Sequence, residues 1–185
     1  MADELQLLQL IAKGDKISFK ELYALYSNKV YATALHYSQN INDAEEITQD
    51  VFVSIFKNAI SFKGNAKVST WVYRIAVNTS LNYIKKKNKR TFFSLEEYNK
   101  EIPNFEHPGV VEEKKENARL MYQAINTLPE NQKTAFILGF IEEKPRQEIA
   151  DIMGTTLKAV ESLLQRAKTN LKIKLEKTNP HRRKL

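Results

Sequence analysis

The sequence contains no cysteine. Disulfide bonds and thiolate metal sites are therefore excluded, and the composition is typical of a reducing compartment. Glycine and proline are also scarce, with five of each in 185 residues, which leaves little material for β-turns. No apolar run approaches the length of a membrane span, and no secretory signal peptide opens the chain. These absences predict a cytoplasmic protein with an all-α fold.

Catalytic and metal-binding groupings are missing as well. His36, His107 and His181 are far apart in the sequence, and none lies at the spacing of a helical metal site. The chain has no glycine-rich phosphate loop and no nucleophile elbow. The sequence therefore predicts a protein that is not an enzyme, needs no metal or other cofactor, and has no small-molecule substrate.

Positive charge is present in excess. The chain has 29 Lys and Arg against 22 Asp and Glu, which gives a net charge of +7. Residues 1–90 and 116–185 each hold 13 cationic and 8 acidic side chains, whereas residues 91–115 hold 3 and 6. Two basic blocks separated by an acidic connector indicate two modules that face nucleic acid.

Apolar residues recur at three- and four-residue intervals along most of the chain, which predicts helices. In the N-terminal module we expect helices at residues 5–11, 18–38, 43–58 and 70–90. Asn42 and Glu45 resemble a capping box for the third, and Ser69 or Thr70 can cap the fourth. The expected organisation is an N-terminal domain (1–90), an acidic linker (91–111), a C-terminal domain (112–178) and a basic tail (179–185).

The most specific pattern lies in the C-terminal module, where Pro129 suits the first turn of a helix. A later short helix, Gln147 to Met153, ends at Gly154, and Thr155 or Thr156 can cap a second helix. Two short helices around a glycine turn predict a helix-turn-helix, with an ordinary helical hairpin as the alternative. Residues suited to a DNA groove lie opposite its core or at its start: Thr156, Lys158, Ser162, Gln165, Arg166 and Thr169.

The third predicted helix carries an acidic stripe of Asp43, Glu46 and Asp50, with Gln49 at its edge. Carboxylates repel phosphates, so this stripe suits a basic protein partner rather than DNA. A plain solvated face is the alternative reading.

The loop at residues 62–67 and the fourth helix combine aromatic rings, amides and cations, which unpaired bases and their phosphates require. Trp71 and Tyr73 could equally belong to the core. The candidate residues are Phe62, Lys63, Asn65, Lys67, Trp71, Arg74, Asn78, Lys85, Lys86, Lys87 and Arg90.

Over nearly its whole length the chain resembles a bacterial RNA polymerase sigma factor of the small extracytoplasmic-function (ECF) type. DAEEITQDVFVSIFKN (43–58) is similar to the region that binds the clamp coiled coil of the polymerase's largest subunit. STWVYRIAVNTSLNYIKKKNKR (69–90) is similar to the helix that engages the −10 promoter element. LPENQKTAFILGFIEEKPRQEIADIMG and VESLLQRAKTNL, within 128–171, are similar to the domain that reads the −35 element.

The resemblance implies sigma regions 2 and 4 in the two domains, and a promoter-specificity subunit that binds core RNA polymerase, duplex −35 DNA and melted −10 DNA. Its polymerase-binding face would comprise Asp43, Glu46, Gln49, Asp50 and Phe52. The 62–67 loop would hold a flipped −10 base, and the cations of the fourth helix would bind the melted strand. An anti-sigma protein, often membrane-anchored, is a further implied partner.

Two positions depart from the commonest pattern of this family. Glu161 and Leu163 stand where the family more often has basic residues. The main alternative is a free-standing helix-turn-helix regulator that binds duplex operators without polymerase, although no dimerising heptad is present. A structural helical adaptor would leave both basic blocks unexplained.

Overall fold

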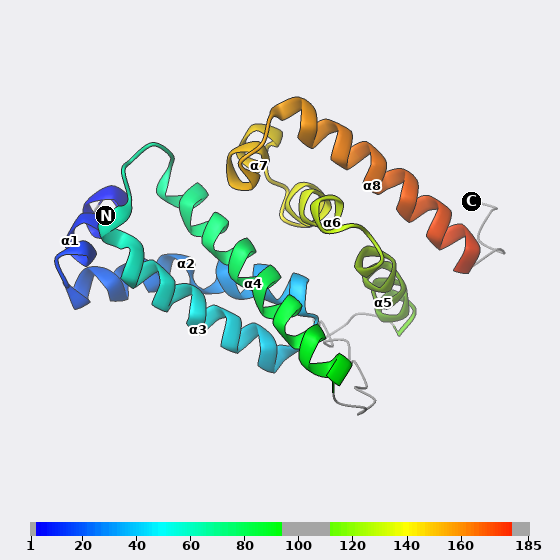
Figure 1. The fold of residues 1–185 in the computed structure, drawn as a ribbon, viewed down its shortest axis with the longest axis horizontal. Coiled ribbons are helices and arrows are strands. Elements are labelled where there is room, and N and C mark those ends of the chain that lie inside the picture. The colour runs from blue at the N-terminus through cyan, green and yellow to red at the C-terminus, as the bar shows by residue number, and fades with distance from the viewer. Residues whose placement is uncertain (1–2, 94–111, 179–185) are drawn as a thin grey trace. The chain divides into compact units, whose positions relative to one another are not determined.

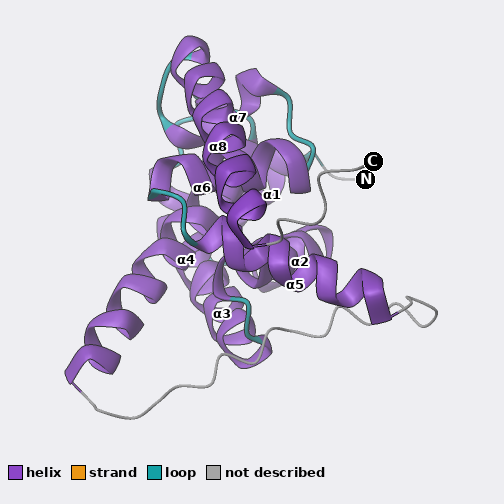
Figure 2. Ribbon diagram, turned by 90° about the vertical axis from the view of Figure 1, so that its right-hand side faces the viewer, coloured by secondary structure: helices purple, strands orange, loops and turns teal. Residues whose placement is uncertain are grey.

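The structure is a computed structural model that describes residues 3–93 and 112–178. All regular structure within these ranges is helical, and none of the described residues forms a strand (Figure 2). The chain divides into two compact units, Met1–Pro103 and Asn104–Leu185. The predicted all-α fold with two helical domains is therefore confirmed. The predicted tail and residues 94–111 of the predicted linker lie outside the described residues.

Within its described residues, the N-terminal unit contains four α-helices, labelled in Figure 1, and a short 3-10 turn. They are α1 (Glu4–Ala12), α2 (Lys16–Ser38), α3 (Ile41–Asn58), η1 (Ala59–Ser61) and α4 (Val68–Phe93). The helix termini differ from the predictions because other residues act as caps. Asp15 accepts from the Ser18 N–H at 2.8 Å, so α2 begins at Lys16. Asn40, rather than Asn42, caps α3.

Helices α2, α3 and α4 pack against one another around the core of the N-terminal unit. Apolar residues at helical spacing supply this core, and burial of each large side chain contributes about 1.5–3 kcal/mol. The fully buried members include Leu22, Ile47, Val51, Ile55, Val72 and Ala76. Because α4 lies against both α2 and α3, only part of its circumference is exposed. It begins at Val68, earlier than the predicted caps Ser69 and Thr70.

The described part of the C-terminal unit, residues 112–178, consists of four α-helices and one π turn. They are α5 (Glu112–Asn126), α6 (Glu130–Phe136), η2 (Ile137–Ile141), α7 (Arg146–Met153) and α8 (Leu157–Thr178). Gly154 ends α7 in the left-handed conformation at φ 63°, which glycine adopts without steric cost. The Thr156 hydroxyl then accepts from the Ala159 N–H at 3.2 Å. The predicted helix-turn-helix is thus present, whereas Pro129 precedes α6 instead of lying in its first turn.

One buried face of α8 joins α7 and the π turn in the core of the C-terminal unit. Val160, Leu164, Ala167 and Leu171 form this face. A Cβ atom on Gly139 would lie 3.2 Å from Leu164 Cδ2, so the absence of a side chain lets η2 approach α8 closely. This packing leaves the opposite side of α8 to solvent.

Candidate protein and nucleic-acid interfaces

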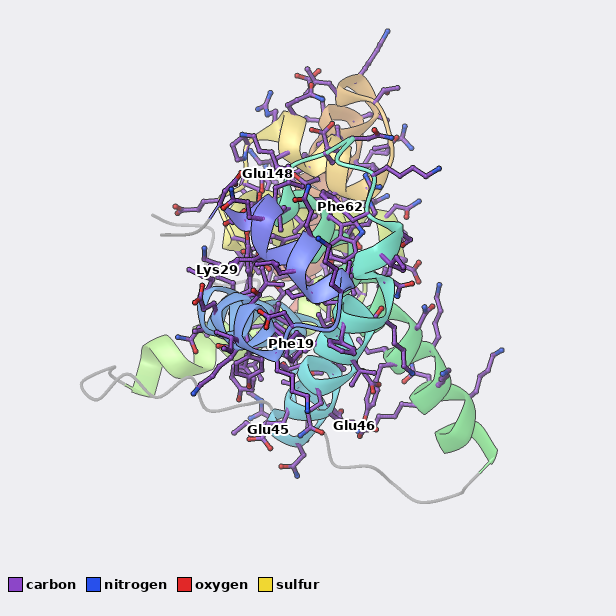
Figure 3. All side chains as sticks on the ribbon, turned by 90° about the vertical axis from the view of Figure 1, so that its left-hand side faces the viewer. Phe19, Lys29, Glu45, Glu46, Phe62 and Glu148 are labelled. Atoms are coloured by element: carbon purple, nitrogen blue, oxygen red, sulfur yellow. The ribbon has the colours of Figure 1, made fainter. Side chains whose placement is uncertain are left out.

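The outer side of α3 carries an exposed acidic face, which we define as Glu46, Gln49 and Asp50. Val53 is exposed one turn after Gln49 and Asp50. Figure 3 shows Glu46 projecting near the start of α3, beside Glu45. Three of the five residues expected to bind polymerase therefore lie together on an accessible surface. Charge of this kind steers and orients a basic protein partner.

Asp43 differs from the exposed position that the stripe predicted. It is only 9% exposed, because it lies on the side of α3 that faces α4. Its two carboxylate oxygens accept from Lys87 Nζ at 2.6 and 2.7 Å. Lys87, which we expected to contact the melted strand, is thus held by a carboxylate of its own unit. No local pattern indicates this pair, because 44 residues separate its members.

Tyr83 connects the same carboxylate to the acidic face. Its hydroxyl lies 2.8 Å from Glu46 Oε2 and 3.1 Å from Asp43 Oδ1. Burial, together with the hydrogen bonds and negative charge of these two carboxylates, raises the pKa of Tyr83 well above its ordinary value. The phenol therefore remains protonated and able to donate at physiological pH.

Phe52 also differs from the expected surface position, with an exposed fraction of 3%. Its ring lies 6.3 Å from Phe19 and 4.5 Å from Tyr23, between ring centroids. Phe56 lies 5.4 Å from Phe19. Tyr23 and Phe56 are exposed, and with Phe19 and Phe52 they form what we call the aromatic ridge. The sequence reasoning missed Phe19, Tyr23 and Phe56 as surface candidates. Phe19 and Tyr23 on α2, and Phe52 and Phe56 on α3, each have the i, i+4 spacing of neighbours on a helix.

The loop between η1 and α4 presents its cations but not its aromatic ring. Phe62 is half-buried and lies 5.2 Å from Trp71, at an angle of 55° between ring planes. Both rings pack against the N-terminal core. Phe62 therefore is not the freely exposed aromatic that the loop pattern predicted. The exposed candidates of this loop are Lys63, Asn65 and Lys67.

The solvent side of α4 carries a row of polar side chains. Its exposed candidates are Arg74, Asn78, Lys85 and Lys86, and Lys89 is also exposed. Arg90 lies within α4, but its side chain is outside the described part of the structure. Tyr73, in contrast, is buried. The exposed amide and cations of α4 suit a sugar–phosphate backbone.

The outer face of α8 presents the predicted groove-binding residues. Lys158, Gln165 and Arg166 are exposed, and Ser162 is half-buried. Arg166 donates to the Ser162 hydroxyl at 2.8 Å, which orients the guanidinium along the helix. Thr156 is exposed, but its hydroxyl already caps α8. Such a row of cations, hydroxyls and an amide can contact both phosphates and base edges.

A groove of about 420 Å³ borders this face between α7, α8 and the π turn. Arg146 and Glu161 lie on its lining and form an ion pair at 3.2 Å. Lys168 lies over the Phe140 ring, 4.6 Å from its centroid. Glu161 is therefore paired with a cation of α7, and the lining of the groove carries more cations than acids.

The described residues offer little for metal binding or membrane insertion. Among them, no three His, Asp or Glu side chains come together in a way that could hold a metal ion. None of the described helices is both long and apolar enough to cross a bilayer.

Two family models match the chain: sigma-70 region 2 matches residues 22–90, and sigma-70 region 4 matches residues 118–171. The ECF RNA polymerase sigma-E factor of Haemophilus influenzae is 30% identical, over 95% of this chain and 98% of the relative. The chain belongs to the ECF RNA polymerase sigma factors. The ECF RNA polymerase sigma factor SigW of Bacillus subtilis is 28% identical, over 91% of this chain and 94% of the relative.

Two solved structures have the same fold as this chain. CnrH in complex with the cytosolic domain of CnrY matches with a TM-score of 0.68 at 21% identity, over 94% of this chain and 97% of that one. The sigma factor RpoE in complex with the anti-sigma factor NepR from Bartonella quintana also matches with a TM-score of 0.68, at 20% identity. That match covers 85% of this chain and 96% of that one.

The family match assigns three surfaces of this sigma factor to its two regions. The acidic face of α3 and the cationic side of α4 both lie within residues 22–90, in region 2. The helix-turn-helix lies within residues 118–171, in region 4. The promoter-specificity function implied by the sequence is thus supported, and a regulator that works without polymerase is not favoured.

Proposed function

We propose that this sigma factor binds core RNA polymerase through the acidic face of α3 and promoter DNA through α4 and α8. The observation that supports this division is the opposite charge of two exposed surfaces in one unit. Glu46 and Asp50 on α3 would repel DNA, whereas the cations on α4 would attract it. A protein that must hold a protein partner and DNA at once needs such a separation.

The acidic face and the exposed aromatic residues beside it fit a polymerase surface that is basic and has an apolar edge. Arginine side chains on that surface can form charge-assisted hydrogen bonds with Glu46 and Asp50, which set its register. The aromatic ridge supplies apolar area beside the charges, through Tyr23 and Phe56. Exposed aromatic residues next to a polar rim are the usual composition of an interface centre.

At the −10 element, the 62–67 loop and α4 hold the melted strand. Extruding a base costs a few kcal/mol, and a stacking surface that captures the base offsets this cost. Phe62 and Trp71 are both half-buried, and the part of this pair that stays exposed supplies the aromatic surface. Lys63, Lys67 and Lys86 neutralise phosphates and thereby make binding dependent on salt.

At the −35 element, α8 enters the major groove of duplex DNA by helix-turn-helix docking. Gln165 has the donor and acceptor geometry to read adenine, and Arg166 has the fork to read guanine. Lys158 is suited to a phosphate. Glu161 and Leu163 add no positive charge here, so this helix relies on fewer cations than is usual in the family.

The chain acts in the cytoplasm without catalysing a reaction itself, and an anti-sigma protein holds it inactive. The bound anti-sigma factor in the solved RpoE structure supports an anti-sigma protein as a partner. We propose that this partner is membrane-anchored, so that a signal at the envelope releases the sigma factor.

Size-exclusion chromatography with bacterial core RNA polymerase tests the proposal. We expect the wild-type chain and a Glu21→Arg control on α2 to co-elute with polymerase, and a Glu46→Arg, Asp50→Arg double variant to elute alone. All three positions are exposed, so folding is not at stake. Co-elution of the double variant would move the interface elsewhere. A wild-type chain that ignores polymerase but shifts duplex DNA would instead establish a free-standing regulator.

A further inference from the structure

We propose that Lys87 and Tyr83 are positioning residues for the polymerase-binding face of α3, and that Lys87 is thereby withheld from promoter DNA. This inference rests on the proposed function, because it concerns how Glu46 is presented to polymerase. The cations near the end of α4, within residues 85–90, then have two roles. Exposed ones such as Lys86 contact phosphates, whereas Lys87 holds Asp43 on α3.

The pair between Lys87 and Asp43 is unlike an ordinary surface ion pair. Both carboxylate oxygens of Asp43 lie within 2.7 Å of the same ammonium nitrogen. The two side chains retain only 27% and 12% of their exposure, for Lys87 and Asp43 respectively. Salt and water screen such a pair much less than an exposed one. Lys87 would have to abandon this partner in order to contact a phosphate.

Tyr83 extends this contact to the surface. Its hydroxyl lies within hydrogen-bond distance of both Asp43 and Glu46. A phenol has one proton, so it can donate fully to only one of two carboxylates at a time. Lys87 satisfies Asp43 through both oxygens, which leaves the shorter bond, at 2.8 Å, for Glu46. The network thus fixes an exposed side chain of the acidic face.

Removing the Lys87 side chain would change the orientation of Glu46 indirectly, through Asp43 and Tyr83. Asp43 would then be a partly buried carboxylate without its ammonium, and it would compete with Glu46 for the Tyr83 proton. The two carboxylates would also repel each other at short range. The predicted result is an acidic face whose Glu46 no longer has one preferred orientation, and therefore weaker binding of polymerase.

Lys86 provides a matched control for Lys87. It is the adjacent residue on α4, and its side chain is exposed. A Lys→Met change removes the same charge and keeps a similar length at both positions. If every cation of this run simply served DNA, the two variants would behave alike.

The first experiment measures the affinity of the full-length, fluorescently labelled chain for bacterial core RNA polymerase by anisotropy. We expect Lys87→Met to weaken binding about tenfold, and Tyr83→Phe about threefold, because hydrogen bonds to charged groups are lost. Lys86→Met should stay within about twofold, and Lys87→Arg should restore most of the affinity. In an Asp43→Asn background, Lys87→Met should have little further effect, because the partner is already gone.

The second experiment measures how holoenzyme binding to a promoter fragment, selected from a randomised library, depends on salt. Loss of one phosphate contact lowers the slope of log K against log[salt] by about 0.7 on a single strand. We expect this decrease for Lys86→Met and no change in slope for Lys87→Met. Core polymerase is kept saturating, so that weaker assembly does not enter the slope.

These outcomes separate the inference from the proposed function. A wild-type chain that does not bind polymerase would overturn both. If the wild type binds but Lys87→Met and Lys86→Met have equal affinities, only the positioning role fails. That role also fails if Lys87→Met lowers the melting temperature but leaves the affinity unchanged well below that temperature. Equal decreases in salt slope would show that Lys87 contacts DNA.

Discussion

The two units each contain one long cationic helix, but α4 and α8 are packed to different extents. Helix α4 lies between α2 and α3 and is buried on more than one side, whereas α8 packs against α5, α6 and α7 through a single face that includes Val160 and Leu164. A helix with one buried face can place the rest of its circumference in a major groove, whereas a helix packed on two sides offers only a strip. The difference suits duplex DNA at α8 and a single strand at α4.

The same difference changes what a lysine does. Lys158 on α8 is exposed, while Lys87 on α4 is held by Asp43 of α3. Lys158 lies on the outer side of a helix with one buried face and is available to DNA, whereas Lys87 lies on a side of α4 that faces another helix. Residue type alone therefore does not assign these side chains to nucleic acid.

The largest expected effect tests whether the two units fold separately. Val51 and Val160 are both fully buried, one in each unit. An aspartate in either place costs several kcal/mol, which is comparable with the whole stability of a small domain. We expect Val51→Asp to abolish hydrogen-exchange protection in the N-terminal unit only, and Val160→Asp in the C-terminal unit only.

Val53→Asp is the control for this prediction, since Val53 is exposed on the same helix as Val51. It should leave protection unchanged in both units. Loss of hydrogen-exchange protection in both units of either core variant would mean that the two units do not fold independently.

A smaller effect distinguishes base reading from phosphate contact on α8. Gln165→Ala should remove the preference at one −35 position, worth about 1–3 kcal/mol of discrimination. Lys158→Ala should instead weaken all sequences alike and lower the salt slope by about 0.9. Selection of −35 elements from a randomised library with each holoenzyme measures both. A uniform loss for Gln165→Ala would contradict direct reading by this residue.

Local patterns predicted the C-terminal unit more accurately than the interfaces of the N-terminal unit. The turn at Gly154 and the outer face of α8 depend on residues close in sequence, so spacing indicates them. For the cap, spacing leaves Thr155 and Thr156 open, and the structure has Thr156. The cap of α3 was misplaced by two residues, because Asn40 and Asn42 are equally good caps and only packing selects between them.

The position of Asp43 could not be predicted in the same way. A helical wheel places it within the acidic stripe, but the partner that buries it lies on α4, 44 residues later. Phe52 was misjudged for a related reason, since rings from α2 cover it. Long-range packing thus decides which members of a correctly predicted helix face remain accessible.

A third effect concerns pH and should be confined to the N-terminal unit. Burial lowers the pKa of His36 below its ordinary 6.5, so the unfolded chain binds a proton more readily than the folded one. Stability should therefore be constant well above pH 6.5 and fall as the pH decreases through that value. Urea denaturation at about pH 7.5 and about pH 5.5 should show this loss in the wild type. His36→Gln should reduce it, and an undiminished pH dependence would assign it to other groups.

The smallest effect is expected at the exposed ion pair between Arg146 and Glu161. These side chains retain 64% and 49% of their exposure, in contrast to the partly buried pair of Lys87 and Asp43. Water screens an exposed pair, so a double-mutant cycle of Arg146→Ala and Glu161→Ala should give a coupling of less than about 0.5 kcal/mol. The same cycle with Lys87→Met and Asp43→Asn should give a larger coupling, because its members are less hydrated. Equal coupling energies would mean that partial burial between α3 and α4 does not strengthen the Lys87–Asp43 pair. The difference in packing between α4 and α8 would then have no effect on the energy of their ion pairs.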